Sequence, residues 1–417
     1  MRDRAALQAL ALLSLSLVLS MTTWFSATAV VPQLRDLWEL SGTGGAWLTI
    51  AVQLGFVTGA LGSSVANLGD VLSPRTVILA GSVGAAIANA LLVAADGLAA
   101  GIPLRFATGF FLAGVYPPAL KLMATWFRRG RGTALGILVG ALTLGSALPH
   151  LVNGLGGLDW RTVIAATSAL TVAGGLVARV FVHEGPFPFP RAAFDPRQAG
   201  LVLRNRGVRL ASLGYFGHMW ELYAAWAWFL VFARAAGFTP RGAAYATFAM
   251  IGIGALGCWA GGVLGDRWGR AETTSLAMAL SGACALAVGL LVDVSPWLVL
   301  AVGLVWGFAV VADSAQFSTV VTELADQSYV ATALALQLAI GFTLTVATIW
   351  LVPILEDAVG WRWAFAFLAP GPALGIAAML RLRSVVAGQL HEEGEDDEHD
   401  DRAERPGDDQ NGMPGLA

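Results

Sequence analysis

At residues 262–270 the chain reads Gly-Val-Leu-Gly-Asp-Arg-Trp-Gly-Arg, where one apolar run, 241–265, ends and shortly before the next, 272–293, begins. Each run has the roughly 20 mostly apolar residues that a helix needs to span the hydrocarbon core of a bilayer. The polar residues between them are too few for anything but a tight turn. This stretch therefore predicts two membrane helices joined at one membrane surface.

The composition of the whole chain agrees with this interpretation. Of the 417 residues, 56% are hydrophobic and 13% are charged, and the mean hydropathy is +0.68. Soluble domains carry about 25% charged residues, and a single soluble core stops growing near ~250–300 residues. The chain also has 50 glycines, and small residues let membrane helices approach closely. We expect a polytopic membrane protein with the lipid bilayer as its solvent.

Apolar runs of spanning length recur along the chain, and we expect an all-α membrane protein of twelve transmembrane helices in two six-helix bundles. The predicted domains are an N-terminal bundle at 1–183, a linker at 184–208, a C-terminal bundle at 209–384 and a disordered acidic tail at 385–417. The tail is predicted from its charge, because residues 391–417 hold eleven Asp and Glu against two Arg and lack apolar periodicity. The twelve runs are 6–32, 44–66, 75–95, 98–126, 132–155, 161–183, 209–235, 241–265, 272–293, 295–322, 329–354 and 361–383.

Basic residues predict the orientation of the chain. If the N-terminus is cytoplasmic, nineteen of the 25 Lys and Arg residues fall on the cytoplasmic side, five on the other side, and Arg105 lies within a helix. Cytoplasmic loops of membrane proteins carry such an excess of Lys and Arg. We expect both termini in the cytoplasm of a bacterial cell and the protein in the inner membrane.

The two halves of the chain resemble each other. Asp70 corresponds to Asp266 and Trp24 to Trp220 at an offset of 196 residues, and Trp160-Arg161 corresponds to Trp361-Arg362 at 201. A slowly drifting offset is typical of an internal repeat. Two parallel repeats joined by a linker are a common design among secondary transporters that work by alternating access.

The 262–270 turn is similar to the loop signature of the major facilitator superfamily, which is a glycine, three residues, and then Asp-Arg-x-Gly-Arg. The first-half copy keeps Asp70 and Arg75 but lacks the leading glycine and the Asp-Arg pair. Arg105-Phe106-Ala107-Thr108-Gly109 is similar to the family's Arg-x-x-x-Gly motif. The resemblance implies a cytoplasmic gate made of Asp70, Arg75, Gly262, Asp266, Arg267, Gly269 and Arg270.

Two further phrases resemble a bacterial permease group described loosely as cyanate- or nitrate-type. They are Gly217-His218-Met219-Trp220-Glu221-Leu222-Tyr223 and Ala312-Asp313-Ser314-Ala315-Gln316-Phe317-Ser318. By contrast, the glycine–proline pattern of drug–proton antiporters is not reproduced by Gly136, Gly140, Gly145 and Pro149.

Ionisable residues at membrane depth are costly and usually face a bundle interior or a cavity. His218 and Glu221 lie three residues apart on one face of the seventh predicted helix, and Asp313 lies deep in the tenth. These three residues are our candidates for proton coupling. The alternative is a polar clamp that joins helices of the C-terminal bundle.

Arg105 is open to two interpretations: a site for an anionic group or for proton coupling, and a structural cation satisfied by backbone carbonyls. The predicted substrate site lies between helices 1, 4, 7 and 10, and helices 7 and 10 border the central cavity in the resembled fold. The full set of candidate substrate-binding residues is Trp24, Arg105, Trp220, Tyr223, Gln316 and Gln337. Gln53, His150, Asn153 and Thr345 are expected to form hydrogen bonds between helices instead.

No motif for soluble enzyme chemistry is found. The sequence has no phosphate-binding Gly–Lys loop and no His-Glu-x-x-His or paired-cysteine spacing. We therefore expect no enzymatic activity, no metal, no cofactor and no nucleic-acid partner, and a monomer that binds a small molecule and protons. The predicted function is proton-coupled secondary transport of a small organic solute, with a lean toward an organic anion. The alternatives are a drug or cation efflux antiporter and, from another class, a receptor or scaffold that does not transport.

Overall fold

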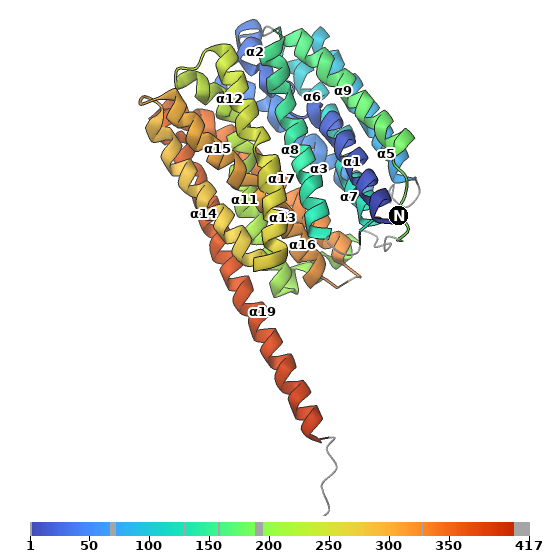
Figure 1. The fold of residues 1–417 in the computed structure, drawn as a ribbon. Helices are drawn as coiled ribbons and strands as arrows, with labels where there is room; N and C mark the ends of the chain where they lie inside the picture. Colours follow the sequence, from blue (N-terminus) through green and yellow to red (C-terminus); the bar gives the residue numbers. More distant parts are fainter. Residues whose placement is uncertain are drawn as a thin grey trace, which may run out of the picture.

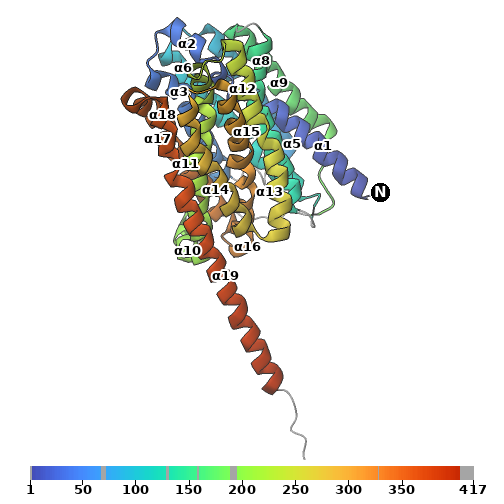
Figure 2. The ribbon, with the colours of Figure 1, turned by 60° about the vertical axis from the view of Figure 1, so that its left-hand side comes forward.

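The computed structural model describes residues 2–66, 72–127, 131–156, 159–187, 195–326 and 328–403, and over these ranges the chain is helical and has no strand. The helices run roughly along one direction and form a bundle, with α19 extending beyond it (Figure 1). We call the end near the start of α1, where α10 and α16 also lie, the linker end. The opposite end, near α2 and the start of α12, is the far end (Figure 2).

Membrane crossings account for most of the fold. Eleven helical segments within the described ranges are long and apolar enough to span a membrane. Helix α11, Arg206–Ala235, is the twelfth crossing and runs through the middle of the C-terminal half. Its mean hydropathy is lower because His218, Glu221 and several Trp and Tyr residues interrupt it. The expected twelve-helix all-α membrane fold is confirmed.

The N-terminal half contains six crossings. The first is interrupted after α1 by two short 3-10 turns, and the fourth is interrupted between α6 and α7, where Pro117 and Pro118 lack the backbone N–H that a continuous helix needs. Its elements are α1 (Arg2–Ser20), η1 (Met21–Thr23), η2 (Thr28–Val30), α2 (Val31–Trp38), α3 (Gly42–Val65), α5 (Pro74–Leu91), η3 (Leu92–Ala94), α6 (Leu98–Leu112), α7 (Tyr116–Ala124), α8 (Arg131–Leu155) and α9 (Trp160–Phe181).

The C-terminal half repeats this design, and its fourth crossing is also interrupted, at Asp313. Before it, the linker region contains η4 (Pro196–Gln198) and α10 (Ala199–Arg204). The half itself consists of α11 (Arg206–Ala235), α12 (Pro240–Gly252), α13 (Gly254–Trp268), α14 (Arg270–Val288), η5 (Gly289–Leu291), α15 (Pro296–Ala312), α16 (Ser314–Leu324), α17 (Val330–Val359), α18 (Trp361–Ala364), η6 (Phe365–Leu368) and α19 (Pro370–Ala403).

Helix α19 differs from the sequence-based expectation. It continues to Ala403, into the segment 385–417 for which we predicted a disordered tail, and it projects from the linker end (Figure 1). No proline interrupts the sequence between Pro372 and Pro406, and Glu, Gln and Ala are good helix formers. Residues 404–417 lie outside the described part.

The two halves meet along two pairs of crossings. Helix α8 packs against α12 and α13, which together form the eighth crossing, and α3 packs against α17. On α8 the contact uses Gly132, Gly136 and Gly140, which are one turn apart. A Cβ added to Gly136 would lie 2.7 Å from the carbonyl oxygen of Cys258 on α13. The two backbones therefore touch almost directly, as small residues in membrane helices allow.

Candidate functional site

A cavity of about 90 Å³ lies between the two halves. A water molecule needs roughly 10–15 Å³ of such space, so the cavity in this conformation holds several waters or a small molecule. Residues from five crossings line it: Tyr116, Leu120, Leu135, Val139, Leu142, Tyr215, Met219, Leu222, Tyr223, Trp226, Val311, Ser314, Ala315, Ser318, Leu338 and Phe342.

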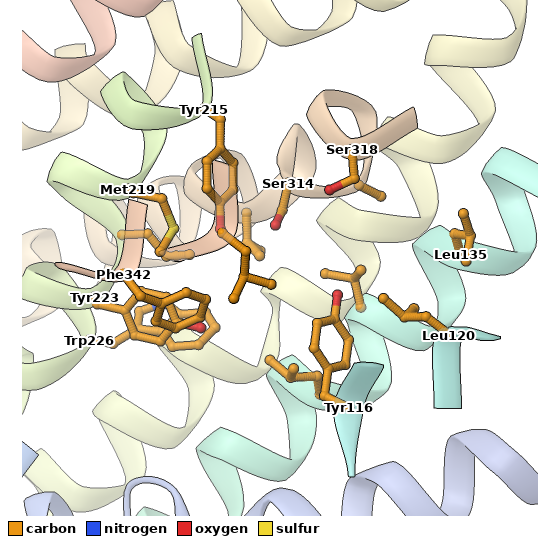
Figure 3. A pocket seen from close by; sticks show the side chains of 16 residues that line it. Tyr116, Leu120, Leu135, Tyr215, Met219, Tyr223, Trp226, Ser314, Ser318 and Phe342 are labelled. Carbon is orange, nitrogen blue, oxygen red and sulfur yellow. The ribbon is translucent and has the colours of Figure 1, made fainter. Parts of the chain in front are cut away.

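The lining is apolar with a few hydroxyl groups, and it includes no charged side chain. The polar groups are the hydroxyls of Tyr116, Tyr215, Tyr223, Ser314 and Ser318. Figure 3 shows the Tyr116 and Tyr215 hydroxyls directed into the same space from opposite sides. None of the five hydroxyls makes a hydrogen bond to another residue in the described ranges. They are therefore available to a bound solute.

An aromatic seal closes the cavity toward the far end. We define this seal as Trp24, Phe25, Phe56, Tyr223, Trp226 and Phe342. The ring centroids of Trp24 and Phe56 are 4.8 Å apart, those of Tyr223 and Phe342 are 5.1 Å apart, and those of Phe25 and Trp226 are 5.8 Å apart. Because the seal joins rings from both halves, it must separate if the halves are to part at the far end.

The residues predicted for proton coupling occupy two separate positions in the C-terminal half. His218 Nδ1 lies 2.8 Å from Asp313 Oδ1, with both side chains buried. The contact is an ion-pair approach and not a linear hydrogen bond, since Asp313 Oδ1 has no aligned donor among the described residues. The His218 ring stacks on Tyr215, which lines the cavity. The pair therefore lies directly behind the cavity wall.

Glu221 is held away from the cavity by two donors. Trp306 Nε1 donates to Oε1 at 2.6 Å, and Ser281 Oγ donates to Oε2 at 2.8 Å. The carboxyl group is buried and bridges α11 to α14 and α15. This geometry is that of the polar clamp we considered as the alternative to proton coupling.

Arg105 is completely buried on α6, and its guanidinium donates to oxygens around the interruption in the first crossing. Its Nε donates to the Leu48 carbonyl at 3.1 Å, and its Nη1 atom donates to the Thr23 carbonyl at 3.0 Å. The remaining acceptors are Ser26 Oγ, Asn89 Oδ1 and the Trp24 carbonyl. No carboxylate within the described ranges pairs with it. Arg105 does not line the cavity and holds the interrupted helix in place.

The linker end carries the predicted gate. Asp266 accepts a hydrogen bond across the interface between the halves, from Thr133 Oγ1 on α8 at 3.1 Å. Arg270 binds Glu323 at 2.7 Å and also donates to Gln316 at 2.7 Å. The Asp266 carboxylate also lies against the first turn of α8, since a Cβ added to Gly132 would meet its Oδ1 at 2.5 Å. Negative charge is favourable at the start of a helix.

The other gate residues are placed less tightly. Gly269 has φ +106°, a left-handed conformation that suits glycine and allows the tight turn between α13 and α14. Gly262 packs against the backbone of Gly132 and Thr133 across the interface, and Arg267 is exposed. Arg75 donates to the Val182 carbonyl within the N-terminal half. Asp70 lies outside the described residues.

Of the six predicted substrate-binding residues, the cavity lining includes Tyr223, and Trp24 contacts it through the seal. Gln316 belongs to the gate network, and Trp220 donates to the Phe367 carbonyl on the side facing α19. Gln337 is buried next to the lining residue Leu338, and its amide nitrogen has no partner in the described ranges. Substrate contact by these three residues stays a prediction.

Sequence reasoning did not select Tyr116, Ser314 or Ser318. Each lies on a helix that begins at an interruption, after Val115 or Asp313. The Tyr-Pro-Pro triplet at 116–118 is the signal that marks such a break in the first half.

Comparison with known proteins identifies the family to which this fold belongs. The family model described as the Major Facilitator Superfamily matches residues 13–347. A crystal structure of the human organic anion transporter MFSD10 (TETRAN) superposes with a TM-score of 0.68 at 17% identity, covering 90% of this chain and 99% of that one. A mutant of the nucleoside transporter NupG gives 0.67 at 14% identity, covering 91% and 99%.

A third structure is a bacterial homolog of the human lysosomal transporter Spinster in an inward-facing and unoccupied conformation. It gives a TM-score of 0.62 at 15% identity and covers 93% of this chain and 95% of that one. Identities this low show a shared fold and no shared substrate, and the resemblance to cyanate- or nitrate-type permeases stays a prediction. The family match spans most of the chain, and the structure has twelve crossings in two repeated halves around a central cavity. This multi-pass membrane protein is therefore a transporter of the major facilitator superfamily and not an enzyme.

Proposed function

We propose that the protein is a secondary transporter that carries a small organic solute with an apolar body by alternating access. The observation that carries this proposal is the cavity itself, which both halves line with aromatic rings and free hydroxyl groups. Aromatic faces with a polar edge suit an amphipathic solute. The linker end is then the cytoplasmic side of a bacterial inner membrane, as the distribution of basic residues predicts.

Proton coupling is supported by the His218–Asp313 pair. The pair connects α11 to the interruption between α15 and α16, behind Tyr215 and next to Ser314. Protonation of Asp313 or deprotonation of His218 weakens the pair and frees the interruption to move. The pair is therefore suited to link proton binding to the shape of the cavity wall. Glu221, with two donors already bound, supports this role less directly.

The solute class proposed is an organic anion. Arg105 is a buried cation with no carboxylate partner among the described residues, so the interior around it carries a positive charge that favours an anion nearby. The cation-efflux alternative has no carboxylate in the cavity lining to support it.

The proposal is tested by filling the cavity. Ala315→Phe places a ring into the cavity from α16, and Ala283→Leu on the exposed face of α14 is the matched control. We expect purified protein in proteoliposomes to accumulate labelled benzoate above the level reached in protein-free liposomes when a pH gradient is imposed, because neutral benzoic acid also diffuses through lipid. Ala315→Phe should abolish this protein-dependent accumulation and Ala283→Leu should keep it. Wild-type protein that binds benzoate yet shows no flux would favour the receptor or scaffold alternative.

Coupling is tested separately with Asp313→Asn, which keeps the size of the side chain and removes its charge. Accumulation driven by the pH gradient should be lost, while exchange of labelled for unlabelled benzoate at equal pH should continue. Accumulation by Asp313→Asn equal to that of the wild type contradicts the role of the pair, and accumulation that follows sodium instead of pH contradicts proton coupling.

A further inference from the structure

Directly beyond the aromatic seal, toward the far end, four helices present buried polar groups that have no partner. They are Trp24 Nε1, Trp226 Nε1, both polar atoms of the Gln53 amide and both ring nitrogens of His150. All four side chains are at most 1% exposed. We call these four residues the polar layer.

The helical periodicity shows that the polar layer continues the wall of the cavity. On α8 the lining residue Leu142 is followed at steps of four by Ser146 and His150, so all three share one face. On α3, Gln53 lies between Thr49, which hydrogen-bonds to Thr28, and Phe56, which packs on Trp24.

Trp24 and Trp226 belong to the seal and the polar layer at once. Their rings contact Tyr223, which lines the cavity, while their indole N–H groups lack an acceptor. The polar layer is thus built from both halves, with Trp24, Gln53 and His150 on one side and Trp226 on the other.

Unsatisfied buried polar groups destabilise a folded protein, and native structures contain few of them. Gln53 and His150, expected from sequence to bond between helices, have no bond at all in the described ranges, whereas Asn153, one turn beyond His150, donates to the Ala29 carbonyl at 2.7 Å. Six unpaired buried atoms therefore belong to these four residues, and this grouping indicates that they are satisfied by something that enters when the halves part at the far end.

The chemistry of the polar layer selects its ligand. Indole N–H groups only donate hydrogen bonds, while the Gln53 amide and the His150 ring each add a donor nitrogen and an acceptor atom, so donor atoms outnumber acceptor atoms in the polar layer by four to two. Arg105 lies immediately behind, with its guanidinium bound to the Trp24 and Thr23 carbonyls and no carboxylate beside it. Donors near an uncompensated cation favour an anionic acceptor.

We propose that the polar layer is the entry site for the carboxylate head of the solute when the transporter is open to the far end, while the apolar body of the solute occupies the cavity between Tyr116, Tyr215 and Phe342. This inference rests on the proposed transport function and adds to it the place and chemistry of head-group recognition.

The test uses four probes that share one ring: benzoate, benzamide, toluene and benzylamine. The apparent melting temperature of the detergent-purified protein is measured with each. We expect the largest rise with benzoate, a smaller rise with benzamide, a still smaller one with toluene and the smallest with benzylamine. A toluene or benzamide effect equal to that of benzoate overturns the proposal.

Two variants distinguish a role of the polar layer in ligand recognition from a purely structural role. Gln53→Leu and His150→Leu remove the unpaired groups and keep the side chains apolar and of moderate size. We expect each to raise the melting temperature without ligand by roughly 1–4 °C and to weaken benzoate binding about tenfold, while leaving the toluene effect unchanged. Lower stability in both variants, or unchanged benzoate affinity, overturns the proposal, because the groups then have structural partners.

These measurements distinguish failure of the polar-layer proposal from failure of the proposed transport function. Protein that selects benzoate through Gln53 and His150 but carries no flux contradicts transport and leaves the polar layer as a binding site. Protein that transports all four probes alike, with an effect of Ala315→Phe but none of Gln53→Leu, supports the cavity and rejects the polar layer.

Discussion

Replacement of Arg105 by lysine tests whether this residue is a structural cation. The guanidinium donates to five oxygens: the carbonyls of Leu48, Thr23 and Trp24, Ser26 Oγ and Asn89 Oδ1. Three of these are backbone carbonyls, two at the interruption of the first crossing and the third, that of Leu48, on the neighbouring helix α3. The Thr23 and Trp24 carbonyls lie where regular helical bonding is broken after Ser20.

The cost follows from the donor count. A lysine ammonium has three donors on a single nitrogen, so Arg105→Lys loses at least two of the five hydrogen bonds. A hydrogen bond from a charged donor contributes about 1.5–3 kcal/mol, which gives a loss of roughly 3–6 kcal/mol. For a protein of this size that corresponds to a fall in melting temperature of about 4 °C or more.

The assay is the apparent melting temperature in detergent, recorded at one fixed heating rate because membrane proteins often unfold irreversibly. Arg267→Lys, in the exposed last turn of α13, is the matched control and should melt with the wild type. If Arg105→Lys is as stable as the wild type but has lost benzoate binding, the residue contacts the solute directly and the structural interpretation is wrong.

Three further predictions concern the packing of α13 on α15, the gate between the halves and the cap of α9. Gly261→Ala should lower the yield of folded protein strongly, since its Cβ would lie 1.8 Å from the Ala312 carbonyl oxygen, whereas Gly62→Ala, with open space around it, should express normally. Asp266→Asn removes the charge that binds Thr133 and the start of α8 and should open the linker end; a water-soluble maleimide should then label a Ser318→Cys protein about fivefold faster, and an unchanged rate would contradict the gate. At the far end, hydrogen bonds from Thr162 lower the pKa of Asp159, which caps α9. A carboxylate with a lowered folded pKa stabilises fully above its ordinary value of about 3.9 and loses that effect as pH falls through the lower value. Melting temperatures from pH 7 to pH 3 should therefore fall more steeply for the wild type than for Asp159→Ala, and parallel curves would reject this role.

Membrane insertion, the number of crossings and the repeat were predictable from sequence because they depend on local properties. Apolar runs of spanning length recur twelve times, and even α11 was found despite its polar residues, because lipid leaves the backbone few alternatives to a helix. The 262–270 turn was expected to join two membrane helices, and in the structure it joins α13 to α14, with Asp266 accepting a hydrogen bond from Thr133 of the other half.

Which side chains share a space depended on the tertiary structure. The rotation of each helix about its axis is set by packing against its neighbours, so a polar residue in the seventh helix can face the cavity, as Tyr215 does, or another helix, as Glu221 does toward Trp306. Arg105 shows the same limit. The sequence is consistent with either an anion site or a structural cation at this position, and only the tertiary structure shows that the guanidinium donates to carbonyls at the interruption of the first crossing. The hydrophobic pattern of this protein determined that its helices cross a membrane in two repeated halves, and the contacts between those helices decided which residues form the cavity, the seal and the polar layer.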